Sequence, residues 1–360
     1  MKSLLSWMLA AALLLALTIG VVPQTAHAQY KAESNAILKI GNKIPLLSGT
    51  DQFGKERNFE NLKGPNGLVI LFYRSADWCP YCKGQLLSLQ RAAARFKEKG
   101  IGLVGVSYDS PEILRFFTER HSITYPLMPD PKSEIIERFG VLNATATGFT
   151  KGMSYPGFVY VSADGRIQET FFEEDYHTRF TGNNVLTKIF PELGDAAPKD
   201  VPAPHLKLSL TQSDDIVSPG NRVTLVAELS LPRDMHVYAP GVEGYKPVAL
   251  EMSQNPHATL QPASYPKSKV LLLPAIGEKV PVFEGKFRIA QDVTVAFDKD
   301  FSQAVASGPA SGTALTLDGN LRYQACDSKI CYPPTSVPVS WQITVLPLNT
   351  ERAPEEIRHK

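Results

Sequence analysis

The sequence predicts two domains of different class, an α/β domain followed by an all-β sandwich. The first half contains an unbroken apolar run over residues 68–73, which is typical of a strand buried on both faces of an α/β sheet. Segments with helical spacing follow that run. The second half instead alternates apolar and polar residues, most regularly over 337–345, without a comparable helical pattern. Such alternation favours an antiparallel sandwich.

The N-terminus has the pattern of a secretory signal. Lys2 precedes an apolar stretch over residues 4–22, and Ala26-His27-Ala28 supplies a small-x-small cleavage pattern. We therefore expect a signal peptide over 1–28 and a mature protein outside the cytoplasm, in the periplasm. The alternative is an uncleaved membrane anchor, because the apolar stretch approaches the length of a spanning helix.

Composition is typical of a globular protein. Of the 360 residues, 43% are hydrophobic and 20% are charged, and the formal net charge is +1. A near-neutral chain gives no reason to expect nucleic acid as a partner. The histidines are scattered without ligand spacing, and a zinc site joining all four cysteines is disfavoured because the cysteine pairs fall in different domains. We expect no metal and no cofactor.

The first domain is expected to order its elements as strand, helix, strand, helix, hairpin and terminal helix. Helical spacing after Cys82 ends at Gly100, and Ser110-Pro111-Glu112 supplies an N-cap, a proline at N1 and an acid in the first turn. The further segments are a strand over 101–106, a short helix over 133–139, hairpin strands over 158–161 and 167–172, and a helix over 184–190.

Two cysteines follow the buried strand where it must turn into a helix. Cys79 is expected at the helix N-terminus, where free N–H groups and the helix dipole favour a thiolate. Such placement lowers a cysteine pKa from about 8.5 to roughly 3.5–7.5. Cys82, one turn later, is positioned to attack a mixed disulfide formed at Cys79. The spacing therefore predicts a dithiol exchange site.

The motif Trp78-Cys79-Pro80-Tyr81-Cys82 resembles the active site of the thioredoxin superfamily. With the segment 104–112, the match over about 40–190 is similar to the redoxin branch that includes peroxiredoxins and the AhpC/TSA family. The resemblance implies a thioredoxin-like domain over 29–190, with Trp78, Pro80 and Tyr81 tuning the dithiol.

The same resemblance implies a cis-proline facing the dithiol, and we assign this role to Pro156, just before the first hairpin strand. A proline there removes one N–H and fixes φ, which is expected to leave the backbone of Tyr155 free to pair with an extended substrate.

Four prolines mark residues 191–204 as a semi-rigid linker before a second domain over 205–347 and a polar tail over 348–360. In the second domain, Cys326 and Cys331 lie between two strands, so they can face each other across a hairpin mouth or bulge. The surrounding Tyr-Gln-Ala-Cys and Cys-Tyr-Pro-Pro resemble the immunoglobulin-like N-terminal domain of DsbD, the membrane thiol:disulfide interchange protein. In that family the pair receives electrons from a transmembrane domain and passes them to thioredoxin-like partners.

Three functional interpretations remain. In the first, the protein is a thiol:disulfide oxidoreductase, with protein disulfides or thiols as substrates. The linker would let Cys326 and Cys331 relay electrons to or from Cys79 and Cys82, and a membrane thiol reductase would complete the path.

The second interpretation is a peroxiredoxin-like peroxidase acting on peroxide. It is disfavoured because Pro-x-x-x-Thr-x-x-Cys, the pattern of that family, is absent. Counting back from Cys82 gives Cys79 and Ser75, and counting back from Cys79 gives Ala76 and Phe72. In the third, the C-terminal domain is a docking module with a structural disulfide.

Overall fold

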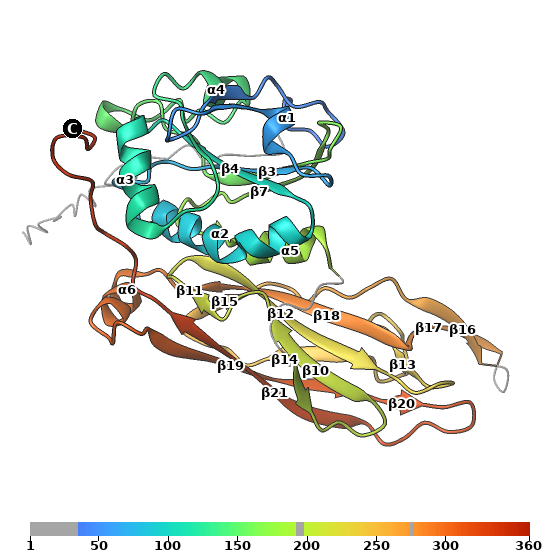
Figure 1. The fold of residues 1–360 in the computed structure, drawn as a ribbon. Coiled ribbons are helices and arrows are strands. Elements are labelled where there is room, and N and C mark those ends of the chain that lie inside the picture. Colours follow the sequence, from blue (N-terminus) through green and yellow to red (C-terminus); the bar gives the residue numbers. More distant parts are fainter. Residues whose placement is uncertain (1–34, 192–197, 274–276) are drawn as a thin grey trace, which may run out of the picture.

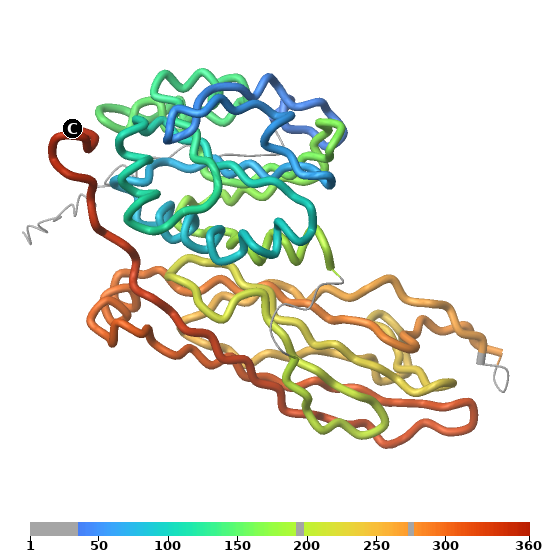
Figure 2. Tube along the Cα trace, viewed as in Figure 1, coloured from blue at the N-terminus to red at the C-terminus, as the bar shows by residue number. Residues whose placement is uncertain are grey.

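The computed structural model describes residues 35–191, 198–273 and 277–360. The expected signal peptide lies outside the described residues. In the described part of the chain, no helix is both long and apolar enough to cross a membrane. Two domains are stacked on each other, and the C-terminal segment runs from the second domain back along the first (Figures 1 and 2).

The first domain is an α/β domain built on a five-stranded sheet of order β5-β4-β3-β6-β7. Strands β3, β4 and β5 are parallel to one another, β6 runs antiparallel to β3, and β7 runs antiparallel to β6. Its strands are β1 (Ser48–Thr50), β2 (Glu56–Asn58), β3 (Leu68–Phe72), β4 (Gly102–Ser107), β5 (Leu127–Pro129), β6 (Gly157–Val161), β7 (Ile167–Phe172) and β8 (Arg179–Phe180). Its helices are α1 (Phe59–Leu62), α2 (Pro80–Glu98), α3 (Pro111–His121), α4 (Glu134–Arg138), the 3₁₀ helix η2 (Gly148–Thr150) and α5 (Gly182–Ile189).

Strand β3 is fully buried because helices cover both faces of the sheet. Val69 and Leu71 pack with α2, α3 and α5 on one face. Leu68 and Ile70 pack with α1 and α4 on the other. The expected buried strand and the helix after it are confirmed, and α2 starts directly after Cys79.

The second domain is mostly strands, which confirms the expected sandwich. One sheet has the order β15-β18-β12-β10-β9, and two four-stranded sheets have the orders β11-β21-β19-β14 and β16-β17-β13-β20. The strands are β9 (Lys199–Val201), β10 (Lys207–Gln212), β11 (Ile216–Val217), β12 (Asn221–Ser230), β13 (His236–Tyr238), β14 (Ala249–Met252), β15 (Ala258–Leu260), β16 (Lys269–Leu273), β17 (Glu278–Glu284), β18 (Lys286–Val295), β19 (Thr313–Tyr323), β20 (Ala325–Cys326) and β21 (Thr335–Val345), with one helix, α6 (Lys299–Ala306).

Alternation along β19 and β21 explains the core of the second domain. Every second residue of each strand is buried, and the two strands pair in antiparallel register along their whole length. Their apolar side chains join one large buried cluster with those of β10, β12 and β18. A period of two is what a sheet with one face on a core requires.

The two domains share a sheet. Strand β8 of the first domain pairs in parallel with the start of β12, joining Arg179 to Asn221. Beside this pair, Thr181 donates a hydrogen bond to buried Asp214 over 2.6 Å. Strand β9 falls inside the segment expected to be a linker and pairs with β10. The two domains are therefore joined by strand pairing and hydrogen bonds, and not only by a flexible linker.

Candidate functional site

Cys79 and Cys82 form a disulfide at the start of α2. Cys79 is the N-cap residue of that helix, and its Sγ accepts a hydrogen bond from the backbone N–H of Cys82 over 3.2 Å. Pro80 occupies the first helical turn, where a missing N–H costs nothing. After reduction, the same N–H groups and helix dipole would stabilise a thiolate at Cys79.

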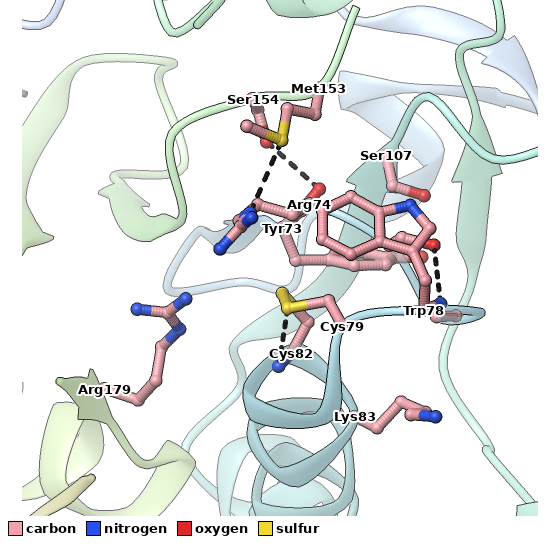
Figure 3. Close-up of a disulfide and its surroundings, with 12 residues drawn as sticks. Tyr73, Arg74, Trp78, Cys79, Cys82, Lys83, Ser107, Met153, Ser154 and Arg179 are labelled. Carbon is pink, nitrogen blue, oxygen red and sulfur yellow. Dashed lines mark hydrogen bonds between the residues drawn. A yellow bond between two sulfur atoms is a disulfide. The ribbon is translucent and has the colours of Figure 1, made fainter. Parts of the chain in front are cut away.

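A cover of aromatic and cationic side chains lies over this disulfide (Figure 3). Cys79 is 1% exposed and Cys82 is fully buried. The guanidinium of Arg74 lies 4.7 Å from the ring centroid of Trp78 and 4.4 Å from that of Tyr176. A partner that attacks this disulfide must therefore first displace part of the cover.

Arg179 is the second cation beside the disulfide (Figure 3). It is 2% exposed, and its guanidinium donates from Nη1 to the carbonyl of Thr178. Nε and Nη2 have no hydrogen-bond partner among the described residues. Burial, with a smaller contribution from the charge of Arg74, lowers the pKa of Arg179 to about 9. Burial likewise lowers the pKa of Arg74.

Two unpaired cations next to the dithiol have a chemical consequence. Among the described residues, no carboxylate forms an ion pair with Arg74 or Arg179. A buried charge without a counter-ion is unfavourable. Reduction of the disulfide creates an anion at this place, so the arrangement favours the thiolate form of the dithiol.

Pro156 does not have the cis peptide bond that the sequence suggested. Among the described residues there is no cis peptide bond, so the Tyr155–Pro156 bond is trans and the expected cis-proline is wrong. The backbone N–H of Tyr155 donates to the carbonyl of Val141 over 2.7 Å. That N–H is therefore already paired and not free for a substrate, because the Leu142–Ser154 bridge holds the segment against its neighbour.

The expected tuning residues lie around the disulfide in different ways. Trp78 donates from Nε1 to the hydroxyl of Tyr108 over 2.8 Å and contacts the ring of exposed Phe149 edge-on. The ring of Tyr81 meets that of His177, also in the first domain, at 4.9 Å between centroids.

The second cysteine pair forms a disulfide between the end of β20 and the segment that follows the 327–330 turn. Cys326 is 1% exposed, whereas Cys331 is exposed. The hydroxyl of Tyr238 lies 3.5 Å from Sγ of Cys331 and 3.8 Å from Sγ of Cys326. The ring of Tyr245 packs on that of Tyr238 at 4.4 Å. Cys331, as the exposed member of the pair, is the cysteine that a partner thiol can approach.

The structure does not bring the two disulfides together. Gly84 and Tyr81, on the helix of the first disulfide, contact the segment Ser218–Gly220, which lies next to β11. Strand β11 pairs with Val345, opposite the Thr313 end of β19, and Cys326 follows the other end of that strand. The 11 residues of β19 span about 33 Å at roughly 3.3 Å per residue. The linker therefore does not place one pair against the other in this arrangement.

Several residues of the first site carried no signal in the sequence. They are Arg74, Asp77, Lys83, Arg179, Arg352 and His359. Arg352 and His359 come from the expected polar tail. The side chain of Arg352 contacts Asp77, 275 residues away in the chain, and that of His359 contacts Asp109, 250 residues away. Across the residues that the structure describes, no group of three or more histidine, cysteine or acidic side chains could hold a metal ion.

Fold and disulfide define a thioredoxin-like redox domain joined to a β-sandwich with a second disulfide. Residues 40–170 match the AhpC/TSA family, and residues 208–340 match the family described as thiol:disulfide interchange protein DsbD, N-terminal. The chain belongs to the AhpC/TSA family through its first domain and carries a DsbD N-terminal domain behind it.

Individual relatives are redox enzymes. Peroxiredoxin Bcp of Escherichia coli K12 is 32% identical over 145 residues, which are 39% of this chain and 88% of that protein. Thiol-disulfide oxidoreductase ResA of Bacillus anthracis is 24% identical over 180 residues, which are 50% of this chain and 94% of that protein. A solved structure, peroxidoxin BcpB of Mycobacterium tuberculosis, is 24% identical and covers 38% of this chain and 88% of that one, with a TM-score of 0.35.

Proposed function

We propose that this protein is an extracytoplasmic thiol:disulfide oxidoreductase in which Cys79 attacks and Cys82 resolves. The observation that carries the proposal is the position of Cys79 as N-cap of α2, hydrogen-bonded to the N–H of Cys82 and flanked by Arg74 and Arg179. Neither arginine forms an ion pair among the described residues. The extracytoplasmic location is proposed from the signal pattern over residues 1–28.

The reaction transfers two electrons from the dithiol to a substrate disulfide. The Cys79 thiolate attacks one substrate sulfur, forms a mixed disulfide and expels the other substrate sulfur as a thiolate. The Cys82 thiolate then attacks Sγ of Cys79, which releases the second substrate thiol and re-forms the Cys79–Cys82 disulfide. The two protons of the original dithiol end on the two substrate thiols. The reverse sequence oxidises a substrate dithiol.

The burial of both cysteines makes access part of the mechanism. Tyr176 and Arg74 are the cover residues that a protein substrate meets first, and Tyr176 is 38% exposed. A substrate segment that displaces the ring of Tyr176 would free the guanidinium of Arg74 to contact the substrate, while buried Arg179 stays in place. The site therefore favours protein substrates that can replace the contact between Arg74 and Tyr176 with contacts of their own.

For the second pair, we propose exchange between separate molecules rather than within one chain. Cys331 is exposed and lies next to the hydroxyl of Tyr238, as an attacked sulfur and its hydrogen-bond donor would. The distance along β19 argues against direct contact of the two disulfides in one chain. A membrane thiol reductase that reduces one of the pairs would supply the electrons.

Trapping the mixed disulfides tests these assignments. In a Cys82→Ser variant, the Cys79 thiolate should hold a disulfide substrate as a stable adduct. A Cys79→Ser variant should form no such adduct through this site. Incubating reduced Cys82→Ser/Cys326→Ser/Cys331→Ser protein with an oxidised Cys79→Ser/Cys82→Ser copy should give a cross-link between Cys79 and the second pair. Absence of the cross-link would exclude the relay but not the exchange activity.

A further inference from the structure

The C-terminal segment lies against the first domain, although it follows the last strand of the second. After β21 it runs past α3 of the first domain (Figures 1 and 2), and Arg352 and His359 reach Asp77, two residues before Cys79. Ala353 is 4% exposed within the same buried cluster as Cys79 and Cys82, and Ile357 packs against that cluster. A merely polar tail would not bury apolar side chains in another domain's core.

The tail supplies every described partner of the Asp77 carboxylate. Arg352 donates from Nε and Nη2 over 2.8 Å each, the N–H of Ala353 donates over 2.9 Å and the N–H of His359 over 3.1 Å. The Asp77 side chain is fully buried, two residues before Cys79. Burial raises the pKa of Asp77, but the hydrogen bonds and charge of Arg352 together with the two backbone donors outweigh it, so that the pKa lies below its usual value.

A second contact of the tail reaches the loop before Cys79, which comprises residues 74–78. His359 lies 2.7 Å from Asp109 through Nε2, and its ring stacks on Tyr108 at 4.3 Å. Asp109 in turn accepts hydrogen bonds from Ser75 and from the backbone N–H of Ala76. The tail thus holds the loop before Cys79 from two sides.

Charge gives these contacts a consequence for the dithiol. An uncompensated carboxylate near Cys79 would oppose a thiolate there, whereas a paired one opposes it less. Lys83 donates to the carbonyls of Asp77 and Glu351, so the same tail also fixes a lysine of α2. Among the described residues, the charged or titratable groups on the segments around Cys79 include Arg74, Asp77, Tyr81, Lys83, Tyr108, Asp109, Asp175, Tyr176, His177, Arg179, Arg352 and His359.

We propose that the C-terminal segment 349–359 is a working part of the dithiol site, in which Arg352 and His359 are positioning residues for the loop before Cys79. This inference rests on the proposed role of Cys79 as the attacking thiol. The tail then does more than fasten the two domains, because it balances the charge of Asp77 beside the reacting sulfur. Its loss would change the chemistry of Cys79 even in a folded protein.

The test is the pH titration of thiolate absorbance at 240 nm in reduced protein whose second pair is replaced by serine. Arg352→Gln should raise the pKa of Cys79 by about one unit, because the backbone donors still hold Asp77 as an anion that is no longer balanced. Arg352→Lys keeps the positive charge, so the pKa of Cys79 in this variant should stay close to the wild-type value. Arg358→Gln, on the same tail but paired only with exposed Glu355, is the matched control and should change nothing.

A charge-neutral double variant separates this role from simple packing. Asp77→Asn/Arg352→Gln removes both charges, so the pKa of Cys79 should return close to the wild-type value. If Arg352→Gln does not fold, His359→Gln, which removes the ring contact with Asp109, tests the same claim and should raise the pKa of Cys79. A Cys79 pKa unchanged in folded Arg352→Gln or in His359→Gln would overturn the proposal. Thiolate absorbance requires no disulfide substrate, so this result is independent of whether the protein catalyses exchange.

Discussion

His177 of the first domain stacks on Phe297 of the second, with ring centroids 5.1 Å apart and ring planes 9° from parallel. His177 also meets the ring of Tyr81, which lies between the two cysteines of the first site. One short chain of aromatic contacts therefore connects the dithiol to the β-sandwich. The second domain helps to form the surroundings of the first site.

Phe297→Ala should loosen this contact. We expect the free energy of unfolding to fall by about 1 kcal/mol, the usual contribution of an aromatic pair beyond its burial. Reduced Cys79 should also be alkylated severalfold faster, because Tyr81 and His177 lose their support. Urea unfolding and iodoacetamide kinetics measure the two effects. An unchanged alkylation rate would show that the second domain does not limit access to Cys79.

Arg179→Gln should raise the pKa of Cys79, because a buried cation without a counter-ion favours the thiolate. An opposite charge within about 4–6 Å shifts a pKa by roughly 1–3 units. Arg222→Gln is the matched control, since Arg222 lies at the same interface but pairs with Glu173 over 2.8 Å. Titration of thiolate absorbance checks the prediction. If Cys79 has the same pKa in both variants, Arg179 does not stabilise the Cys79 thiolate.

Tyr238→Phe should affect the second pair. The Tyr238 hydroxyl lies 3.5 Å from Sγ of Cys331 and can donate to the thiolate formed on reduction. Without it, we expect the pKa of Cys331 to rise by about one unit. The pH dependence of alkylation in a Cys79→Ser/Cys82→Ser background measures this. Tyr245→Phe, whose hydroxyl donates to Glu278 instead, should leave the pKa unchanged.

Lys83 should give the protein a stability term that depends on alkaline pH. Burial lowers its pKa from 10.5 to about 8. Between these values the unfolded chain binds a proton that the folded chain does not, so the free energy of unfolding rises with pH across this window. In Lys83→Met that rise should be absent. Urea unfolding of the oxidised protein at pH 7 and pH 10 measures the difference, with exposed Lys97→Met on the same helix as control. A rise of the same size in Lys83→Met would contradict the assignment.

The sequence predicted the parts of the fold that depend on local pattern. The apolar run before Cys79 and the N-cap at Ser110 report burial and capping within one segment, and both are confirmed. The alternation in β21 likewise shows one face on a core. Such signals are strong because a strand or helix repeats them at a fixed period.

Long-range pairing left no comparable signal. Arg352 and Asp77 are 275 positions apart and belong to segments that read as polar. Nothing in the sequence distinguishes Arg179 from a surface arginine, because its burial depends on the pairing of β8 with β12. The backbone partner of Tyr155 likewise carried no signal, because its N–H donates to Val141, which lies 14 residues earlier in the chain.

The central claim is that Cys79 attacks disulfides, and the most direct test compares two reactions of fully reduced protein. The rate of loss of the Cys79 thiolate is measured against a disulfide substrate and against hydrogen peroxide, in a Cys326→Ser/Cys331→Ser background with Cys79→Ser as control. The account predicts fast exchange with the disulfide and slow reaction with peroxide. A fast, saturable reaction with peroxide beside slow disulfide exchange would contradict it and identify a peroxidase.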